Sequence, residues 1–165
     1  MQIRRADLGD IEALLPQFEA YRAFYKCDAA PDTARAFLKE NLETGRSIIF
    51  IAQDDSGKVV GFSQLYPRVS SLSMSPYIYI SDLYVDKSAR RHGIARKLMN
   101  VVKDFSIASG ARNVQLETAH TNVNAQGLYE SLGYEQDLDY RTYALSLKKT
   151  EHAAPSPAPV PVLVW

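Results

Sequence analysis

Apolar and polar residues follow two different rhythms along the 165-residue chain. Spacings of three and four residues predict amphipathic helices, whereas β-branched or alternating runs predict strands. The helical rhythm occurs in residues 11–22, 32–44, 94–109 and 125–132. The strand-like runs are residues 2–6, 47–53, 58–67, 77–85, 113–119 and 141–147. The predicted order is therefore strand, two helices, three strands, helix, strand, helix, strand.

This order is typical of an α/β protein with a mixed, mostly antiparallel sheet. The turn sequence DDSG predicts a hairpin at residues 54–57, and the strand–helix–strand unit over 77–119 adds a parallel pair. Helices should cover both faces of the sheet. We expect six to seven strands and about four helices in one domain, residues 1–149. Residues 150–165 contain four prolines and predict an extended, flexible tail.

Composition narrows the function classes. The chain has 19 basic and 19 acidic residues, and its formal net charge of zero argues against nucleic-acid and anionic-membrane binding. Its apolar runs are too short to span a bilayer, and no signal-peptide pattern opens it, so a cytoplasmic protein is expected. The histidines are scattered and Cys27 is the single cysteine. We therefore predict no metal site and no internal disulfide.

Positive charge gathers before a predicted helix in RRHGIARKL, residues 90–98. The first N–H groups of a helix lack partners, and the helix dipole adds positive charge there. Gly93 leaves the backbone open to an anion, and Arg90, Arg91 and Arg96 can donate charge-assisted hydrogen bonds. An ordinary turn with solvated basic residues explains the pattern equally well. A P-loop is excluded because no Gly-Lys-Ser/Thr follows, and a Rossmann fingerprint because only one of its glycines is present.

The stretch VDKSARRHGIA, from Val85 to Ala95, is similar to the acyl-coenzyme A signature of the GNAT N-acetyltransferase superfamily. That signature has Gln or Arg, two free positions, Gly, one free position, and then Gly or Ala. A second family block, NVNAQGLYESLGY, follows at residues 122–134. The resemblance covers residues 3–147 and is strongest over 77–134. It implies the GNAT fold, in which the sheet is splayed between strands 4 and 5, and acetyl-coenzyme A as co-substrate.

The resemblance also implies how the coenzyme is held. Backbone amides of residues 91–96 would bind its pyrophosphate, and backbone groups of Leu83 and Val85 would pair with its pantetheine arm like an added strand. Asn122 matches a family asparagine that caps the last helix or contacts the pantetheine, two compatible roles. The full predicted cofactor-binding set is Leu83, Tyr84, Val85, Arg90, Arg91, His92, Gly93, Ile94, Ala95, Arg96, Asn122 and Tyr129.

Three residues are candidates for the chemistry. A primary amine, with a pKa of roughly 10.4, must lose a proton before it attacks, and the leaving thiolate must gain one. Tyr129 matches the acid of many family members, although its spacing also fits a core aromatic residue. Glu117, near the end of its strand, is the first candidate for the base, and a solvated carboxylate would look the same. Asp82 is its rival, because a carboxylate inside an apolar strand must be hydrogen-bonded or functional.

The sequence thus predicts an N-acetyltransferase that moves an acetyl group from acetyl-coenzyme A to a small primary amine by direct attack in a ternary complex. Acetylation of a protein N-terminus or lysine is one alternative, and a non-catalytic acyl-coenzyme A sensor is another. Members of the family often dimerise, so a homodimer is expected. The acceptor site should lie among the first two helices, loop 68–76 and region 135–143. Aromatic walls would come from Tyr21, Phe24 and Tyr25, and Asp137 and Asp139 could attract an ammonium group.

Overall fold

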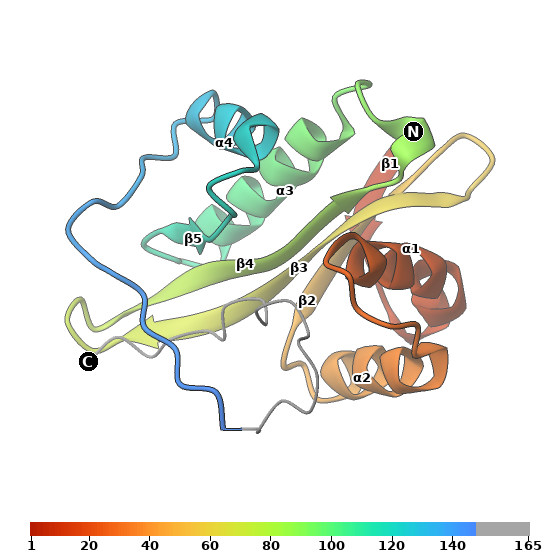
Figure 1. The fold of residues 1–165 in the computed structure, drawn as a ribbon, viewed down its shortest axis with the longest axis horizontal. Helices are drawn as coiled ribbons and strands as arrows, with labels where there is room; N and C mark the ends of the chain where they lie inside the picture. The colour runs from red at the N-terminus through yellow and green to blue at the C-terminus, as the bar shows by residue number, and fades with distance from the viewer. Residues whose placement is uncertain (148–165) are drawn as a thin grey trace.

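A single five-stranded sheet organises the computed structural model, which describes residues 1–147 (Figure 1). The strands lie in the order β1-β2-β3-β4-β5; β1 to β4 pair antiparallel, and β5 pairs parallel to β4. This mixed sheet confirms the predicted fold class. The predicted tail, residues 150–165, lies outside the described residues. The strands are β1 (Gln2–Arg5), β2 (Ile48–Gln53), β3 (Val59–Ser70), β4 (Ser75–Val85) and β5 (Val114–Leu116).

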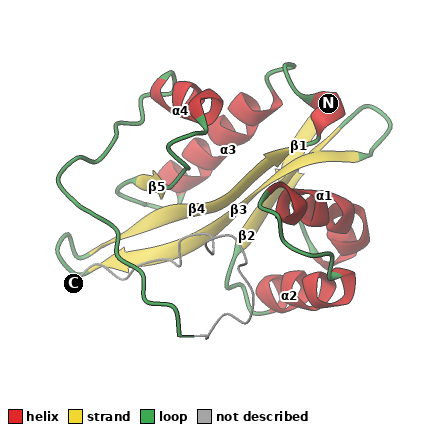
Figure 2. Cartoon of the chain, viewed as in Figure 1, coloured by secondary structure: helices red, strands yellow, loops and turns green. Residues whose placement is uncertain are grey.

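Within the described chain four α-helices cover the sheet, α1 and α2 on one face and α3 and α4 on the other (Figures 1 and 2). No helix within residues 1–147 has both the length and the apolar character that crossing a membrane requires. Short 3₁₀ turns, η1 (Leu8–Asp10) and η2 (Lys87–Ala89), precede α1 and α3. The helices are α1 (Ile11–Phe24), α2 (Pro31–Glu43), α3 (Ile94–Ala108) and α4 (Val123–Glu130).

The run IIFIAQ in β2 is apolar at successive positions because both faces of the strand are buried. Ile49 and Ile51 pack in the cluster under α1 and α2, and Ile48 and Phe50 pack in the cluster under α3. A strand with helices on both sides is expected to lose polar alternation in this way. The two helix layers are therefore joined through β2.

A β-bulge in the β3–β4 hairpin decides which side chains share a face. Gln64 pairs with Asp82, but the next residue, Leu65, pairs with Ile80, so Ser81 is an extra residue. Ile80 packs under α3, whereas Tyr84 packs under α1 and α2. Because side chains alternate along a strand and the bulge adds one residue, Tyr79 shares the α1 face with Asp82 and Tyr84.

Three expectations about the strands are wrong. The predicted strand over residues 141–147 is irregular and exposed, so the sheet formed by residues 1–147 has five strands instead of six or seven. Its apolar side chains, such as Tyr143 and Leu145, are 77% and 83% exposed. β5 has only three residues, and an edge this short offers too few hydrogen bonds to hold another strand. The predicted loop at 68–76 is instead mostly hairpin, because β3 extends to Ser70 and β4 begins at Ser75.

Strands β4 and β5 separate early, as the resemblance implies. Their pairing comprises Ile78 with Val114, Tyr79 with Gln115 and Ile80 with Leu116. The next part of β4, residues 81–85, has no strand partner on that side within the described chain. An unpaired stretch of strand edge therefore opens inside the sheet, between β4 and α4.

Gly61 supports the strand that carries this edge. A Cβ atom at Gly61 would lie 2.8 Å from the Tyr84 carbonyl oxygen, which is backbone and cannot rotate away. Gly61→Ala should therefore push β3 from β4 and lower the free energy of unfolding by roughly 1–3 kcal/mol. Urea denaturation checks this value, and Gly127→Ala, where a Cβ meets open space, is the control. Equal stability of Gly61→Ala and the wild type would contradict the prediction.

Candidate active site

The free edge of β4 presents the backbone groups of Leu83 and Val85. Asp86 donates its N–H to the Val60 carbonyl at 2.9 Å, so the polar groups of Asp86 point toward β3. Along a strand these groups alternate in direction, so those of Val85 and Leu83 point away from β3, toward the gap beside β5. The structure thus gives both residues the orientation that strand-like pairing with an extended ligand requires.

The loop after β4 delivers an uncapped helix N-terminus to the same end of this gap. The Asp86 side chain accepts a hydrogen bond from the Ser88 N–H at 2.8 Å and fixes η2. Gly93 then takes φ of 73° as the N-cap of α3, and no side chain caps the helix. A Cβ at Gly93 would point into open space. The first N–H groups of α3, including that of the buried Ile94, are therefore available to an anion.

The three arginines of the loop have different surroundings. Arg90 Nε donates to the Val85 carbonyl at 2.9 Å, and Arg96 donates to the Ser131 hydroxyl at 2.7 Å, which ties α3 to α4. Arg91 has φ of 69°, is exposed, and makes no side-chain hydrogen bond within the described chain. Of the three guanidinium groups, that of Arg91 is the one left fully free for a phosphate.

Asp82 is a buried carboxylate on the α1 face of β4. Burial raises the pKa of Asp82 to about 6, and hydrogen bonds from Tyr21 and Ser81 offset only part of this effect. Tyr21 comes from the last turns of α1, and its own pKa is strongly raised by burial, so it remains a donor. A carboxylate whose pKa lies near neutrality is suited to accept a proton at physiological pH.

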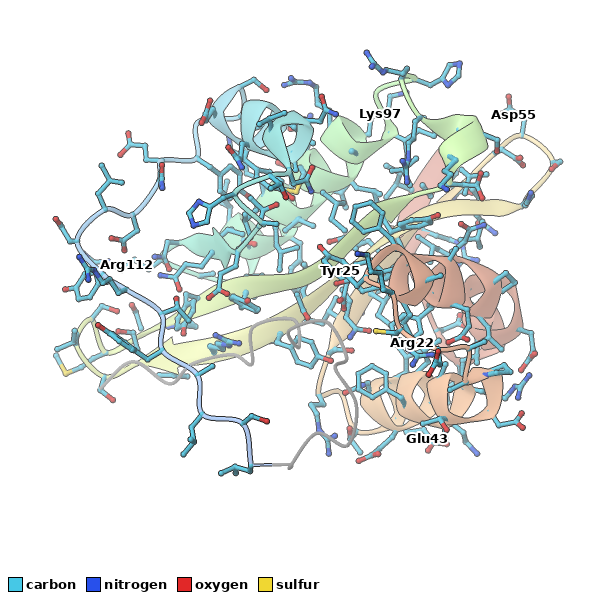
Figure 3. All side chains as sticks on the ribbon, viewed as in Figure 1. Arg22, Tyr25, Glu43, Asp55, Lys97 and Arg112 are labelled. Atoms are coloured by element: carbon cyan, nitrogen blue, oxygen red, sulfur yellow. The ribbon has the colours of Figure 1, made fainter. Side chains whose placement is uncertain are left out.

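Tyr25, which follows α1, and Tyr129 on α4 lie close enough for Tyr25 to affect the pKa of Tyr129. Burial raises the pKa of Tyr129 to about 12, with a further contribution from Tyr25; burial and then Asp82 raise the pKa of Tyr25. Figure 3 shows Tyr25 at the end of α1 nearest the middle of β4. The turn that carries it is fixed by Glu19, which binds Arg22 at 2.6 Å and the Ala30 N–H at 2.8 Å. Asp82, Tyr25 and Tyr129 thus belong to one neighbourhood.

Glu117 lies just after β5, on the same face of the sheet as Tyr79. Its neighbour Gln115 pairs with Tyr79, and Glu117 follows two residues later, level with Ser81. Partial desolvation raises the pKa of Glu117, and the charge of Arg68 opposes that rise. Glu117 is more exposed than Asp82. The structure therefore places both candidate bases on one side of the sheet, with Asp82 the more deeply buried.

The other residues that the sequence predicts for the site differ in their surroundings. Asn122 caps α4, accepting the Ala125 N–H at 3.4 Å, which confirms one of its two predicted roles. His92 is exposed beside the Ala89 carbonyl. Asp137 accepts the N–H groups of Asp139 and Tyr140 in a local turn and faces solvent. Among the described residues no His, Cys, Asp and Glu group could hold a metal ion; His152 lies outside them.

The sequence does not single out Tyr66, Arg68 or Tyr79 as site residues, although the predicted acceptor region includes loop 68–76. Tyr66 and Tyr79 lie in runs that the sequence predicts as strands, but Arg68 falls in the predicted loop 68–76, and the longer hairpin brings it into the sheet. Alternation along an unbroken β4 would also have placed Tyr79 on the face opposite Asp82. Only the bulge at Ser81 reverses that assignment, and bulges leave no reliable mark in a single sequence.

Comparisons with known proteins identify relatives of the chain and of its fold. The model of the acetyltransferase (GNAT) family matches residues 14–134. The chain is 40% identical over 147 residues to "Uncharacterized N-acetyltransferase YhfO" of Bacillus subtilis (strain 168), covering 89% of this chain and 98% of the relative. It is 28% identical over 139 residues to D-amino-acid N-acetyltransferase HPA3 of Saccharomyces cerevisiae, covering 82% and 85%. The crystal structure of a probable acetyltransferase matches with a TM-score of 0.86 at 34% identity, covering 91% and 100%.

Proposed function

The chain belongs to the acetyltransferase (GNAT) family, and from this premise we propose that it acetylates a small primary amine by direct attack on acetyl-coenzyme A. The observation that carries the proposal is the meeting of three features at one gap in the sheet. These are the free edge of β4, the uncapped N-terminus of α3 and the buried carboxylate of Asp82. The yeast relative's name, which specifies D-amino acids, supports a small amine as acceptor.

The residues of the gap fit acetyl-coenzyme A. An uncapped helix start with free N–H groups suits a pyrophosphate, and the outward backbone groups of Leu83 and Val85 suit the amides of pantetheine. Arg91 supplies a free guanidinium at the rim. The coenzyme would supply an activated acetyl thioester, and the outward N–H of Val85 is the simplest donor to the oxyanion that forms on attack.

Asp82 is proposed as the base that takes the ammonium proton, directly or through a water molecule. With a pKa of about 6, the Asp82 carboxylate is mostly ionised at pH 7 and is still basic enough to accept a proton from the ammonium group. Glu117 remains the alternative base, because it lies on the same face. The acceptor would enter from the α1 side, where Tyr21 and Tyr25 line the approach.

Tyr129 is proposed as the acid that protonates the departing thiolate. With a pKa of about 12 its hydroxyl carries a proton throughout the physiological range. Its position on α4, across the gap from β4 and close to Tyr25, fits this role. The homodimer and the cytoplasmic location stay predictions from the resemblance and the sequence pattern.

Thiol release from acetyl-coenzyme A across a panel of amines tests the function. The panel contains polyamines, amino acids, aminoglycosides and short peptides. Turnover on small amines with mass-spectrometric detection of the acetylated product is the expected result. Saturation by peptides alone would favour a protein acetyltransferase, and tight coenzyme binding without any turnover would favour a sensor.

Ala95→Glu separates coenzyme binding from folding. A carboxylate in the first turn of α3 interacts favourably with the helix dipole, so stability should rise by about 0.3–1 kcal/mol. The same charge repels a pyrophosphate, so the KM for acetyl-coenzyme A should rise roughly tenfold, or about 1.4 kcal/mol. Thermal melting and steady-state kinetics measure the two effects. A stabilised variant with unchanged KM would place the pyrophosphate elsewhere, and Asn100→Glu, further along α3, controls for charge alone.

A further inference from the structure

The α1 face of the sheet continues beyond the two helices that cover it. Strands β3 and β4 extend past α1 and α2 toward the hairpin turn (Figure 1). On this extension Tyr66 pairs with Tyr79, and Arg68 pairs with Tyr77. Gln64, directly opposite Asp82, donates to the Tyr66 hydroxyl at 2.7 Å. A polar and aromatic surface therefore runs from Asp82 outward along the hairpin.

The side chain of Arg68 extends along this surface toward Asp82. Its cross-strand partner is Tyr77, yet its guanidinium carbon lies 3.8 Å from the ring centroid of Tyr79. The side chain is thus displaced by two residues, roughly 7 Å, in the direction of Asp82. The contact with the Tyr79 ring restrains the guanidinium, and a guanidinium packed on a ring can still donate its N–H groups to an anion.

No carboxylate of the described chain, residues 1–147, forms an ion pair with Arg68, although the side chain is half-buried. Glu117 is close enough for its pKa to respond to Arg68, without forming an ion pair. Elsewhere partly buried arginines are paired: Arg4 binds Asp10 and Arg22 binds Glu19, both at 2.6 Å. A half-buried, oriented and unpaired guanidinium beside a reaction site is the arrangement of an anion-recognition residue.

We propose that Arg68 binds a carboxylate of the acceptor, so that the preferred substrates are small amines that carry a carboxylate, the amino acids in particular. This inference rests on the proposed function. The ammonium end meets the carboxylates of Asp82 and Glu117, and the carboxylate end meets the guanidinium over Tyr79. The two ends of a zwitterion thus find opposite charges on one face. An amine without a carboxylate leaves Arg68 unpaired when the site is covered.

The test uses pairs of acceptors that differ only in the carboxylate: phenylalanine with phenethylamine, lysine with cadaverine, and γ-aminobutyrate with propylamine. The wild type should show kcat/KM at least tenfold higher for the carboxylated member of at least one pair. Arg68→Gln should lower that value 10- to 100-fold and change the value for the plain amine less than threefold. Arg68→Lys, which keeps the charge but loses the fork and the stacking, should lose 3- to 10-fold.

Arg112→Gln is the matched control, because it removes an exposed guanidinium near the same end of the sheet (Figure 3). It should leave every ratio unchanged. Thermal melting and the KM for acetyl-coenzyme A should be the same in all variants. If Arg68→Gln does not fold, Arg68→Lys supplies the comparison, because it preserves the charge and the aliphatic stem.

The outcomes separate this inference from the proposed function. Equal rates on both members of every pair, or equal losses on both in Arg68→Gln, would overturn the role of Arg68 and leave an acetyltransferase. If no amine is turned over, calorimetry with phenylalanine in the presence of coenzyme A decides. Binding weakened at least tenfold in Arg68→Gln would support carboxylate recognition without catalysis. Absent or unchanged binding would overturn it.

Discussion

Tyr129→Phe should lower kcat roughly 100- to 1,000-fold while the KM values for both substrates change little. The phenol carries a proton at every physiological pH because its pKa is about 12, and a positioned general acid contributes about 10²–10⁴ in rate. Phenylalanine keeps the ring packed beside Tyr134, at a centroid separation of 6.1 Å, so folding should be preserved. Steady-state kinetics with the best amine of the panel give the measurement.

The identity of the acid has a more specific signature. A thiol of low pKa leaves without protonation, so an acetyl thioester of an aromatic thiol should react almost equally fast with wild type and Tyr129→Phe. Tyr134→Phe is the matched control, since its phenol also has a pKa raised by burial and lies beside the same helix. Similar kcat in Tyr129→Phe and the wild type would assign Tyr129 to packing alone.

Hydrophobic spacing and turn residues predict most of the fold correctly, because several features of the sequence indicate the same helix or inner strand. α3 combines Gly93 at its start, an apolar stripe and a stop at Gly110, and its observed bounds, Ile94–Ala108, lie close to the predicted ones. The run at β2 is apolar throughout because it is buried on both faces. In such segments propensity, pattern and tertiary burial favour the same state, so a single sequence predicts them well.

The failures occur where pairing, not propensity, decides the structure. Residues 141–147 have strand-like composition, but a strand requires a partner, and β5 is too short to provide one. The site shows the same limit. The sequence marks Asp82 as a candidate because burying a carboxylate in an apolar strand is costly. It places Arg68 in a predicted loop. Arg68 shares the face of Asp82 because β3 continues past Gln64, and its contact with Tyr79 depends on the bulge at Ser81, which only the three-dimensional register reveals.

Burial of Asp82 also links activity to stability. The pKa of Asp82 is raised from 3.8 to about 6, so between roughly pH 4 and 6 the folded state binds more protons than the unfolded state. Stability attributable to this group is therefore present at low pH, falls as the pH rises through 6, and stays lower above it. A shift of two pKa units corresponds to an upper value of about 3 kcal/mol. The ionised carboxylate that the reaction needs thus destabilises the fold.

Asp82→Asn should therefore reduce kcat/KM at least 100-fold and yet stabilise the protein at pH 8 by roughly 1–3 kcal/mol. The gain should shrink toward pH 4.5, where the wild-type carboxylate is protonated. The wild-type profile of kcat/KM should rise through pH 6, and in Asp82→Asn that rise should vanish. Glu117→Gln is the paired control and should retain the rise. Because both carboxylates lie on one face, the reverse result, with the rise lost in Glu117→Gln alone, would make Glu117 the base and leave Asp82 a positioning residue for Tyr21.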